Sequence, residues 1–222
     1  MKKILSVFSI LIITSSAAYG SEPVMANWSG PYAGLIAGRS MGDGSINDPS
    51  NFAFFDDADG YVPLKPSGNY AGALVGMNWQ TGPVVYGVEA DYAFGSASDS
   101  TPTAYPGTLD WGNIGTTRAR LGYATGKALF YVTGGAAVSK INNKVFYDPL
   151  PCGTSGTVCD EKTRIGMVMG LGAEAMLNPK VSLKLEYNRI NFKDATLDNN
   201  GGAFYTFKNR SDFIKFGLNY HF

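Results

Sequence analysis

The sequence predicts an all-β protein, an eight-stranded antiparallel up-and-down transmembrane β-barrel with short periplasmic turns and four long extracellular loops. Eight segments alternate between bulky apolar residues and small or charged ones, and successive side chains of a strand point to opposite faces. The connections between these segments are alternately long and short. The strand glycines fall almost entirely on the face that carries the charges, which is typical of a barrel with lipid outside.

The first four predicted strands lie near residues Tyr32–Arg39, Tyr70–Gln80, Val84–Phe94 and Gly115–Ala124. The third has the clearest alternation, because Glu89 and Asp91 lie between bulky apolar residues. In the fourth, Arg118 and Arg120 alternate with apolar residues in the same way. The side chains that we expect on the outward faces are Ala33, Leu35, Ala37, Val75, Met77, Trp79, Tyr86, Val88, Ala90, Tyr92, Phe94, Ala119, Leu121 and Tyr123.

The last four predicted strands lie near residues Leu129–Lys140, Arg164–Leu177, Val181–Asn191 and Ile214–Phe222. The final segment alternates without interruption and ends on an aromatic residue. The side chains that we expect on the outward faces are Phe130, Val132, Ala136, Val138, Ile165, Met167, Met169, Leu171, Ala173, Val181, Leu183, Leu185, Tyr187, Ile214, Phe216, Leu218, Tyr220 and Phe222.

The connections predict the orientation of the barrel. Three are tight turns rich in Gly, Pro and Asn, at Thr81–Pro83, Thr125–Lys127 and Asn178–Lys180. The four long ones lie near Met41–Asn69, Gly95–Asn113, Ile141–Thr163 and Phe192–Arg210. Outer-membrane barrels have short periplasmic turns and longer extracellular loops, so we expect both termini in the periplasm. A soluble lipocalin-type barrel is the alternative, but it would place the bulky apolar wall inside.

Residues 1–20 have the features of a secretory signal peptide. Lys2 and Lys3 precede the apolar run Ile4–Ile13, and small residues with Ala18 and Gly20 follow. A transmembrane anchor is the alternative, but the apolar run is roughly half of the ~20 residues that a helical span needs. We therefore expect one outer-membrane β-barrel domain over residues 21–222, in the cell outer membrane of a Gram-negative bacterium.

The composition excludes several classes of partner. The chain has 18 basic and 18 acidic residues, and loss of Lys2 and Lys3 would leave a slight acidic excess. Such a balance provides no basic field for nucleic acid. Beyond the N-terminal run no segment is apolar enough for a membrane helix, so a membrane location requires a barrel.

The inward faces carry a balanced set of charges, which predicts an ionic plug. An eight-stranded barrel is only wide enough for side chains to fill, and a buried ion is costly unless it is paired. We expect pairing between neighbouring strands and no solute channel. An acid/base couple of Glu89 and Asp91 is the alternative, but nearby arginines would hold both as carboxylates. The predicted network comprises Glu89, Asp91, Arg118, Arg120, Glu174, Lys184, Glu186 and Lys215.

The sequence contains no arrangement of residues that indicates an enzyme. Its single histidine, His221, lies on the inward face at the periplasmic end. A lipid-modifying hydrolase would require a histidine with a serine and an acid near the outer leaflet. Lipid modification and a small pore are therefore the less favoured functions, and we expect no cofactor, metal site or catalytic residue.

Cys152 and Cys159 predict a disulfide. Both lie in the Gly- and Thr-rich stretch Asp148–Lys162, and an exported protein meets an oxidising compartment. A metal-binding pair is the alternative, but no nearby group completes a tetrahedral site.

Seven ordered motifs give the chain a resemblance to a known family. They are Trp28–Gly34, Gly76–Gln80, Tyr86–Tyr92, Thr117–Tyr123, Tyr131–Gly135, Leu183–Tyr187 and Phe216–Phe222. It resembles the alphaproteobacterial branch of the small OmpA-like outer-membrane β-barrel proteins, the porin family, over essentially the whole mature chain. This resemblance implies a surface antigen, and some members of the family bind hemin. The alternation of Phe216, Leu218, Tyr220 and Phe222 also looks like the signal that the outer-membrane assembly machinery reads.

We therefore expect an outer-membrane structural and surface-interaction protein of the antigen or adhesion type. Its partners would be outer-membrane lipid, lipopolysaccharide, the assembly machinery and a host surface ligand bound by the loops. Surface hemin binding is the alternative function. Because no loop contains a histidine, an axial ligand would come from Tyr61, Tyr105, Tyr147, Tyr205 or Met41.

Overall fold

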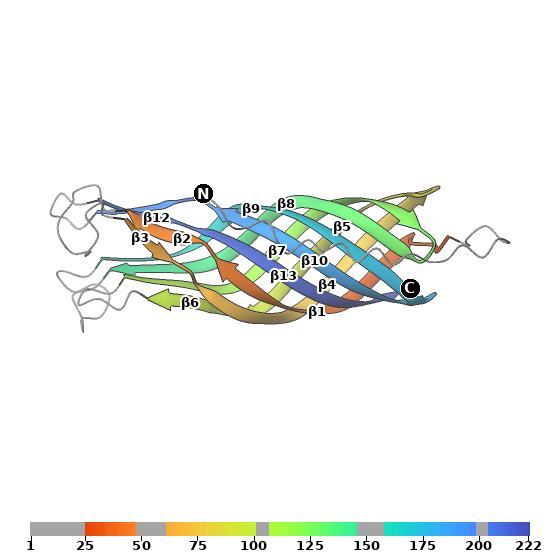
Figure 1. The fold of residues 1–222 in the computed structure, drawn as a ribbon, viewed down its shortest axis with the longest axis horizontal. Coiled ribbons are helices and arrows are strands. Elements are labelled where there is room, and N and C mark those ends of the chain that lie inside the picture. Colours follow the sequence, from red (N-terminus) through yellow and green to blue (C-terminus); the bar gives the residue numbers. More distant parts are fainter. Residues whose placement is uncertain (1–24, 48–60, 101–106, 146–157, 199–203) are drawn as a thin grey trace, which may run out of the picture.

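The computed structural model describes residues 25–47, 61–100, 107–145, 158–198 and 204–222 (Figure 1). All regular structure in these ranges is β-strand. No helix within them is long and apolar enough to cross a bilayer. The strands are β1 (Gly30–Gly42), β2 (Gly44–Asn47), β3 (Tyr61–Leu64), β4 (Ser67–Thr81), β5 (Val84–Gly95), β6 (Ala97–Ser100), β7 (Gly107–Thr125), β8 (Ala128–Val145), β9 (Val158–Asn178), β10 (Val181–Phe192), β11 (Ala195–Asp198), β12 (Phe204–Lys208) and β13 (Arg210–His221).

Eight long strands close into an antiparallel barrel, which confirms the predicted fold class. Their order is β1, β13, β10, β9, β8, β7, β5 and β4, and pairing of β4 with β1 completes the ring. The first and last strands meet in register, with Tyr32 opposite His221 and Gly42 opposite Ser211. The predicted tight turns join β4 to β5, β7 to β8 and β9 to β10. Two of them use glycines with positive φ, Gly82 (58°) and Gly126 (54°).

The apolar wall of every long strand lies on the outside of the barrel. Leu35, Ile165 and Phe216 are 68%, 67% and 61% exposed, whereas Glu89 and Arg118 are each 2% exposed. A soluble barrel would show the reverse pattern, so the structure agrees with a lipid-facing exterior. Outward aromatics lie near both ends of the band, including the stacked rings of Trp79 and Tyr86.

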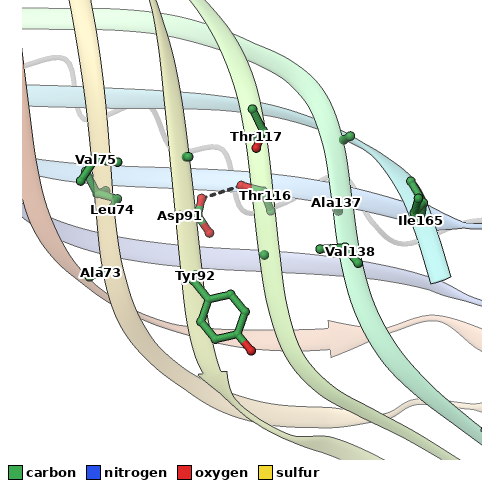
Figure 2. Close-up of a pocket in the computed structure, with 13 residues that line it drawn as sticks. Ala73, Leu74, Val75, Asp91, Tyr92, Thr116, Thr117, Ala137, Val138 and Ile165 are labelled. Atoms are coloured by element: carbon green, nitrogen blue, oxygen red, sulfur yellow. Dashed lines mark hydrogen bonds between the residues drawn. The ribbon is translucent and has the colours of Figure 1, made fainter. Parts of the chain in front are cut away.

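Small outward residues on β4, β5, β7 and β8 leave a shallow apolar hollow of about 500 Å³ in this wall. Figure 2 shows Val75, Tyr92 and Ile165 among the side chains around it. Asp91 and Thr116 also line the hollow, but their side chains are buried, and the Thr116 hydroxyl donates a hydrogen bond to Asp91. The hollow is mostly apolar and is therefore part of the lipid-facing surface.

The strand ladders continue well past the predicted ends, so the four long connections between barrel strands are partly β-strand. The stretches predicted as connections contain β2, β3, β6, β11 and β12 and the outer parts of β7, β8 and β9. For example, β1 pairs with β13 up to Gly42 and Ser211, and β2 then pairs with β12 from Ser45 and Lys208. We call this extension of the wall the collar; the end of the barrel opposite it is the short-turn end.

The interior contains two apolar clusters besides the charged residues, and the sequence reasoning missed both. The collar core fills the collar and the adjoining part of the barrel, and the basal cluster lies at the short-turn end. The collar core comprises Tyr32, Ile36, Ile46, Leu64, Tyr70, Leu74, Ala93, Ala97, Leu109, Trp111, Ile114, Ala137, Ile141, Val168, Ile190, Phe192, Ala195, Phe207 and Phe213. The basal cluster comprises Trp28, Val85, Ala124, Leu129, Tyr131 and Met176.

Candidate functional site: the charged barrel interior

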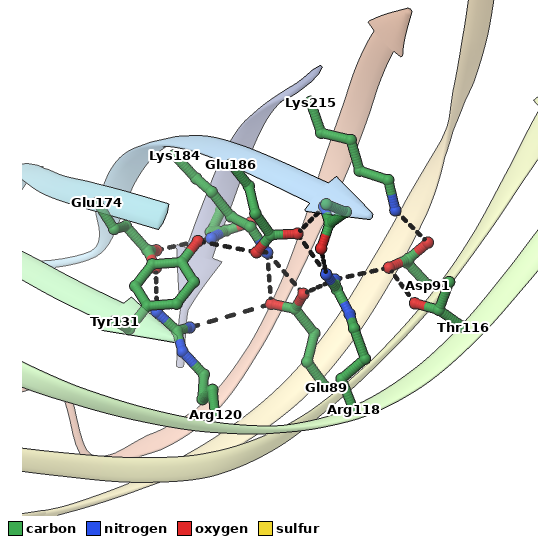
Figure 3. A network of polar contacts seen from close by, with 12 residues as sticks. Glu89, Asp91, Thr116, Arg118, Arg120, Tyr131, Glu174, Lys184, Glu186 and Lys215 are labelled. Atoms are coloured by element: carbon green, nitrogen blue, oxygen red, sulfur yellow. Dashed lines mark hydrogen bonds and ion pairs between the residues drawn. The ribbon is translucent and has the colours of Figure 1, made fainter. Parts of the chain in front are cut away.

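The structure places all eight charged residues of the predicted network inside the barrel (Figure 3). They come from β5, β7, β9, β10 and β13, and each is at most 5% exposed. Four are acids and four are bases, so the set is neutral when all are ionised. That balance allows every buried charge to have a counter-charge.

Arg118 joins three carboxylates. Its Nη2 atom lies 2.5 Å from Glu89 Oε1 and 2.8 Å from Asp91 Oδ2. Its Nη1 atom donates to Glu186 and, at 2.7 Å, to Asn188 Oδ1. The planar guanidinium presents several donors in fixed directions, and this single side chain therefore ties β5 to β10 across the lumen.

Glu89 is the corresponding centre among the acids. Lys184 Nζ lies 2.6 and 2.7 Å from its two carboxylate oxygens, and the Tyr32 hydroxyl donates to Oε2 at 2.9 Å. Lys184 also lies 3.3 Å from Glu186. Lys215 Nζ donates to Asp91 Oδ1 at 3.0 Å. These contacts place β1, β5, β10 and β13 in one connected network.

Arg120 forms the part of the network nearest the short-turn end. Its Nη2 atom lies 2.8 Å from Glu174 Oε2, and its Nη1 atom donates to the Tyr32 hydroxyl at 3.0 Å. The guanidinium carbon lies 4.0 Å from the centre of the Tyr131 ring, a cation–π contact. The Tyr131 hydroxyl in turn donates to Glu186 at 3.0 Å.

The expectation that charges pair between neighbouring strands is only partly correct. Glu89 and Arg118 are directly opposite each other on β5 and β7 and do pair. Lys215, however, is opposite Glu186 in register but contacts Asp91 across the lumen. The interior of an eight-stranded barrel is narrow, so long side chains reach strands beyond their neighbours.

Two glycines make room for the tyrosines of the network. A Cβ atom at Gly76 would overlap the Tyr32 ring, and one at Gly172 would overlap the Tyr131 ring. Each ring lies over the bare backbone of a glycine on a neighbouring strand. The inward glycines are therefore packing positions for the rings and the charges.

Ser182, His221 and Glu174 form a cluster that the sequence reasoning did not predict. The Ser182 hydroxyl lies 2.9 Å from His221 Nε2 and donates to Glu174 Oε1 at 2.5 Å. The His221 ring stacks on Tyr32 and meets Trp28 edge-on. Strand alternation already places Ser182 on the inward face, between Val181 and Leu183, and this signal could have identified it.

The geometry of this cluster differs from that of a hydrolase triad. In a triad the acid holds one ring nitrogen of histidine while the other nitrogen faces the serine. Here Nε2 is close to both Ser182 and, at 3.7 Å, Glu174. Ser182 and Glu174 are at most 1% exposed, so a substrate cannot reach the hydroxyl. The cluster joins β9, β10 and β13 to the start of β1 as a structural contact.

Charges in the collar form separate, more exposed pairs. Asp160 accepts from Arg164 and, at 2.9 Å, from Lys162, and Lys140 pairs with Glu161. The hydrogen bond from Lys140 holds the pKa of Glu161 below its usual value. Burial raises the pKa of Asp110 on β7, and the nearby Lys144 charge opposes that shift.

Other predicted residues lie partly or wholly outside the described ranges. Cys152 does so, so the Cys152–Cys159 disulfide stays a prediction; Cys159 lies on β9 opposite Lys144. Among the residues proposed for hemin, Tyr105 and Tyr147 are outside these ranges. The side chains of Tyr61 and Tyr205 are not described, and Met41 is exposed on β1. Hemin binding therefore stays a prediction.

The closed barrel, its apolar exterior and its ionic interior define a small transmembrane β-barrel of the outer-membrane type. The chain belongs to the outer membrane protein beta-barrel domain family, whose model matches residues 6–222. It is an outer-membrane β-barrel protein with a buried ionic network.

Two relatives and one solved structure illustrate this membership. The 31 kDa outer-membrane immunogenic protein of Brucella melitensis is 30% identical, over 96% of this chain and 91% of the relative. The 22 kDa outer membrane protein of Rhizobium leguminosarum bv. viciae is 29% identical, over 80% and 71%. The crystal structure of OprG from Pseudomonas aeruginosa superposes with a TM-score of 0.55 at 12% identity, over 87% and 96%, and so supports the fold alone.

Proposed function

We propose that this chain is a structural and surface-interaction protein of the outer membrane, of the antigen or adhesion type. The barrel serves as a filled, rigid mount, and contacts with the outside are made by the collar and the connections that it carries. The names of the Brucella relatives, outer-membrane immunogenic proteins, support a chain that is accessible at the cell surface.

The layered interior carries this proposal. The ionic network lies between the collar core and the basal cluster, which hold aromatic rings such as Trp111 and Trp28 at 0% exposure. A solute would have to displace paired charges and two apolar layers, and each step is costly. A filled interior favours a mount over a pore.

The height of the barrel supports display of its outer end. Strand β9 has 21 residues, which at ~3.3 Å per residue and a tilt of ~40° rise about 50 Å. The apolar band of such barrels is only ~25 Å tall. About half of the wall therefore stands beyond the hydrocarbon, and the collar core stiffens that half.

The orientation and the export signals complete the proposal. The collar and its connections lie outside the cell, and the short turns and both termini lie in the periplasm. Residues 1–20 act as a signal peptide and residues 21–222 as the barrel domain. The outward alternation of Phe216, Leu218, Tyr220 and Phe222 engages the assembly machinery. Export also favours the Cys152–Cys159 disulfide.

Two measurements test this function together. In planar bilayers the pure protein is expected to give no steady single-channel current; large, stable current steps contradict the filled mount.

Cells that produce the protein are expected to adhere to epithelial monolayers more than cells with shortened connections at residues 48–60 and 146–157. Heat-modifiable gel migration shows that each barrel has folded, and equal adherence of folded variants refutes the adhesion role.

Labelling of intact cells tests the orientation separately. In a background with Cys152→Ser and Cys159→Ser, a membrane-impermeant maleimide is expected to label Ser98→Cys in the collar. Lys127→Cys, in the turn between β7 and β8, is expected to react only after the cells are lysed. The opposite pattern reverses the proposed topology.

A further inference from the structure

A polar niche lies where the barrel meets the collar, lined by residues at the ends of β10 and β12 and at the starts of β2 and β13. These strands are labelled in Figure 1. Its volume is about 490 Å³, within the ~300–1,000 Å³ range of small-ligand sites. The side chains that matter here are Asp43, Asn191, Asp194, Lys208 and Arg210. Nothing in the proposed surface-interaction function uses this place.

An irregularity in the strand ladder shapes the niche. β10 pairs with β13 up to Asn191 opposite Arg210, and β11 pairs with β12 from Ala195 opposite Phe207. Between these two pairs, three residues join β10 to β11 but only two join β12 to β13. The extra residue forms a β-bulge at Lys193 and Asp194. Bulges change the direction of a side chain and bend the strand locally. The bulge places Asp194 at the niche.

The charged side chains around the niche do not form ion pairs with one another. Among the described residues, no carboxylate lies within ion-pair distance of Lys208 or Arg210, and Arg210 Nε donates only to Asn191 Oδ1, at 2.8 Å. Asp43 and Asp194 likewise have no basic partner in this part of the chain. One step down the wall the situation differs, because Arg189 and Asp212 form two bonds of 2.7 and 2.9 Å.

The height of the niche matches the lipid headgroups. On β10 and β13 the outward apolar residues end at Tyr187 and Ile214, which are opposite each other. On the flanking strands β1 and β9, exposed Met41 and Met167 lie opposite Asp212 and Asn191. The next outward pair is Arg189 and Asp212, and the one after that is Asn191 and Arg210. Two residues along a tilted strand rise about 5 Å, so the niche lies at the collar-side edge of the apolar band, where the headgroup layer begins.

We infer that the niche binds the phosphorylated sugar headgroup of an outer-leaflet glycolipid. Lys208 and Arg210 supply charged donors for a phosphate, and Asp43 and Asp194 accept hydrogen bonds from sugar hydroxyls. A simple anion would use only the first pair and would be repelled by the second. The inference rests on the proposed orientation, with the collar on the outer side of the membrane.

Titration of the purified, refolded protein in LDAO micelles tests this inference without depending on the orientation in cells. The three probes are lipid A, phosphatidylglycerol and glucosamine 1-phosphate, and binding is followed by calorimetry. Lipid A is expected to bind more tightly than phosphatidylglycerol. The double variant Lys208→Gln/Arg210→Gln is expected to lower its affinity by about tenfold or more. Lys65→Gln, an exposed lysine outside the niche, is the matched control and is expected to leave it unchanged.

Substitution of the two acidic residues of the niche distinguishes a phosphosugar site from a bare-anion site. Asp43→Ala/Asp194→Ala is expected to weaken lipid A binding, because the sugar hydroxyls lose their acceptors; tighter binding means a bare-anion site and overturns the inference. Equal affinity of wild type and the cationic double variant also overturns it. If glucosamine 1-phosphate binds and lipid A does not, the niche takes a soluble phosphosugar and the glycolipid assignment is wrong. Heat-modifiable migration shows that every variant has folded.

Discussion

Arg118 shows at the scale of one residue how the interior is held together. It contacts Glu89, Asp91 and Glu186, and its side chain is 1% exposed. Removal of such a group leaves several buried carboxylates short of a counter-charge. The resulting loss of stability exceeds the net free energy that the intact ion pairs contribute to folding. The stability of the network therefore depends on its completeness.

Arg118→Met is expected to lower the free energy of unfolding by about 3–5 kcal/mol. Urea titration of the refolded protein in lipid vesicles, followed by tryptophan fluorescence, measures this loss. The matched control is Arg189→Met, because the Arg189 side chain is 50% exposed in its pair with Asp212, and exposed pairs contribute ~1 kcal/mol or less. Equal losses in the two variants contradict a buried, coupled network.

Gly172→Ala is expected to destabilise the barrel by about 1–3 kcal/mol, because the added methyl group meets the Tyr131 ring. Gly134→Ala is the control: its added Cβ has no atom within 4 Å, and we expect little change. The same urea titration measures both. A Gly134 variant as unstable as the Gly172 variant would show that glycine is needed for backbone reasons alone.

At the scale of the element, alternation alone predicted the long strands but not the collar. Strand β5 could be predicted because its outward residues, such as Tyr86 and Tyr92, differ strongly in polarity from the inward Glu89. β2 has the sequence GSIN and β6 has ASDS, short polar stretches typical of turns. Their strand state comes from ladders that run on from β1 and β4, a tertiary effect that local sequence does not encode.

The connection between β8 and β9 carries the predicted disulfide. Val145 pairs with Val158, so the ladder fixes both ends of this connection. In protein prepared without reductant, iodoacetamide is expected to modify neither Cys152 nor Cys159, and after treatment with dithiothreitol it is expected to modify both. Intact mass measures the modification. A thiol that reacts before reduction shows that the bond is absent.

At the scale of the whole molecule, the interior is a stack of an apolar, an ionic and an apolar layer inside an apolar shell. The sequence predicted which side chains enter the ionic layer, because inward alternation identifies them one strand at a time. It did not predict that Lys215 pairs with Asp91 or that Arg120 stacks on Tyr131. Those partners depend on how the ring closes, which brings strands distant in sequence across a narrow lumen.

Spin labels along β10 test most directly which wall meets the hydrocarbon. Single cysteines replace Leu183, Leu185, Tyr187 and Asn191 in the Cys152→Ser/Cys159→Ser background, and collision with oxygen and with a water-soluble nickel chelate is measured in lipid vesicles. Labels at positions 183, 185 and 187 are expected to collide mainly with oxygen, and the label at 191 mainly with nickel. Preferential collision of the label at 185 with nickel would contradict a lipid-facing apolar wall.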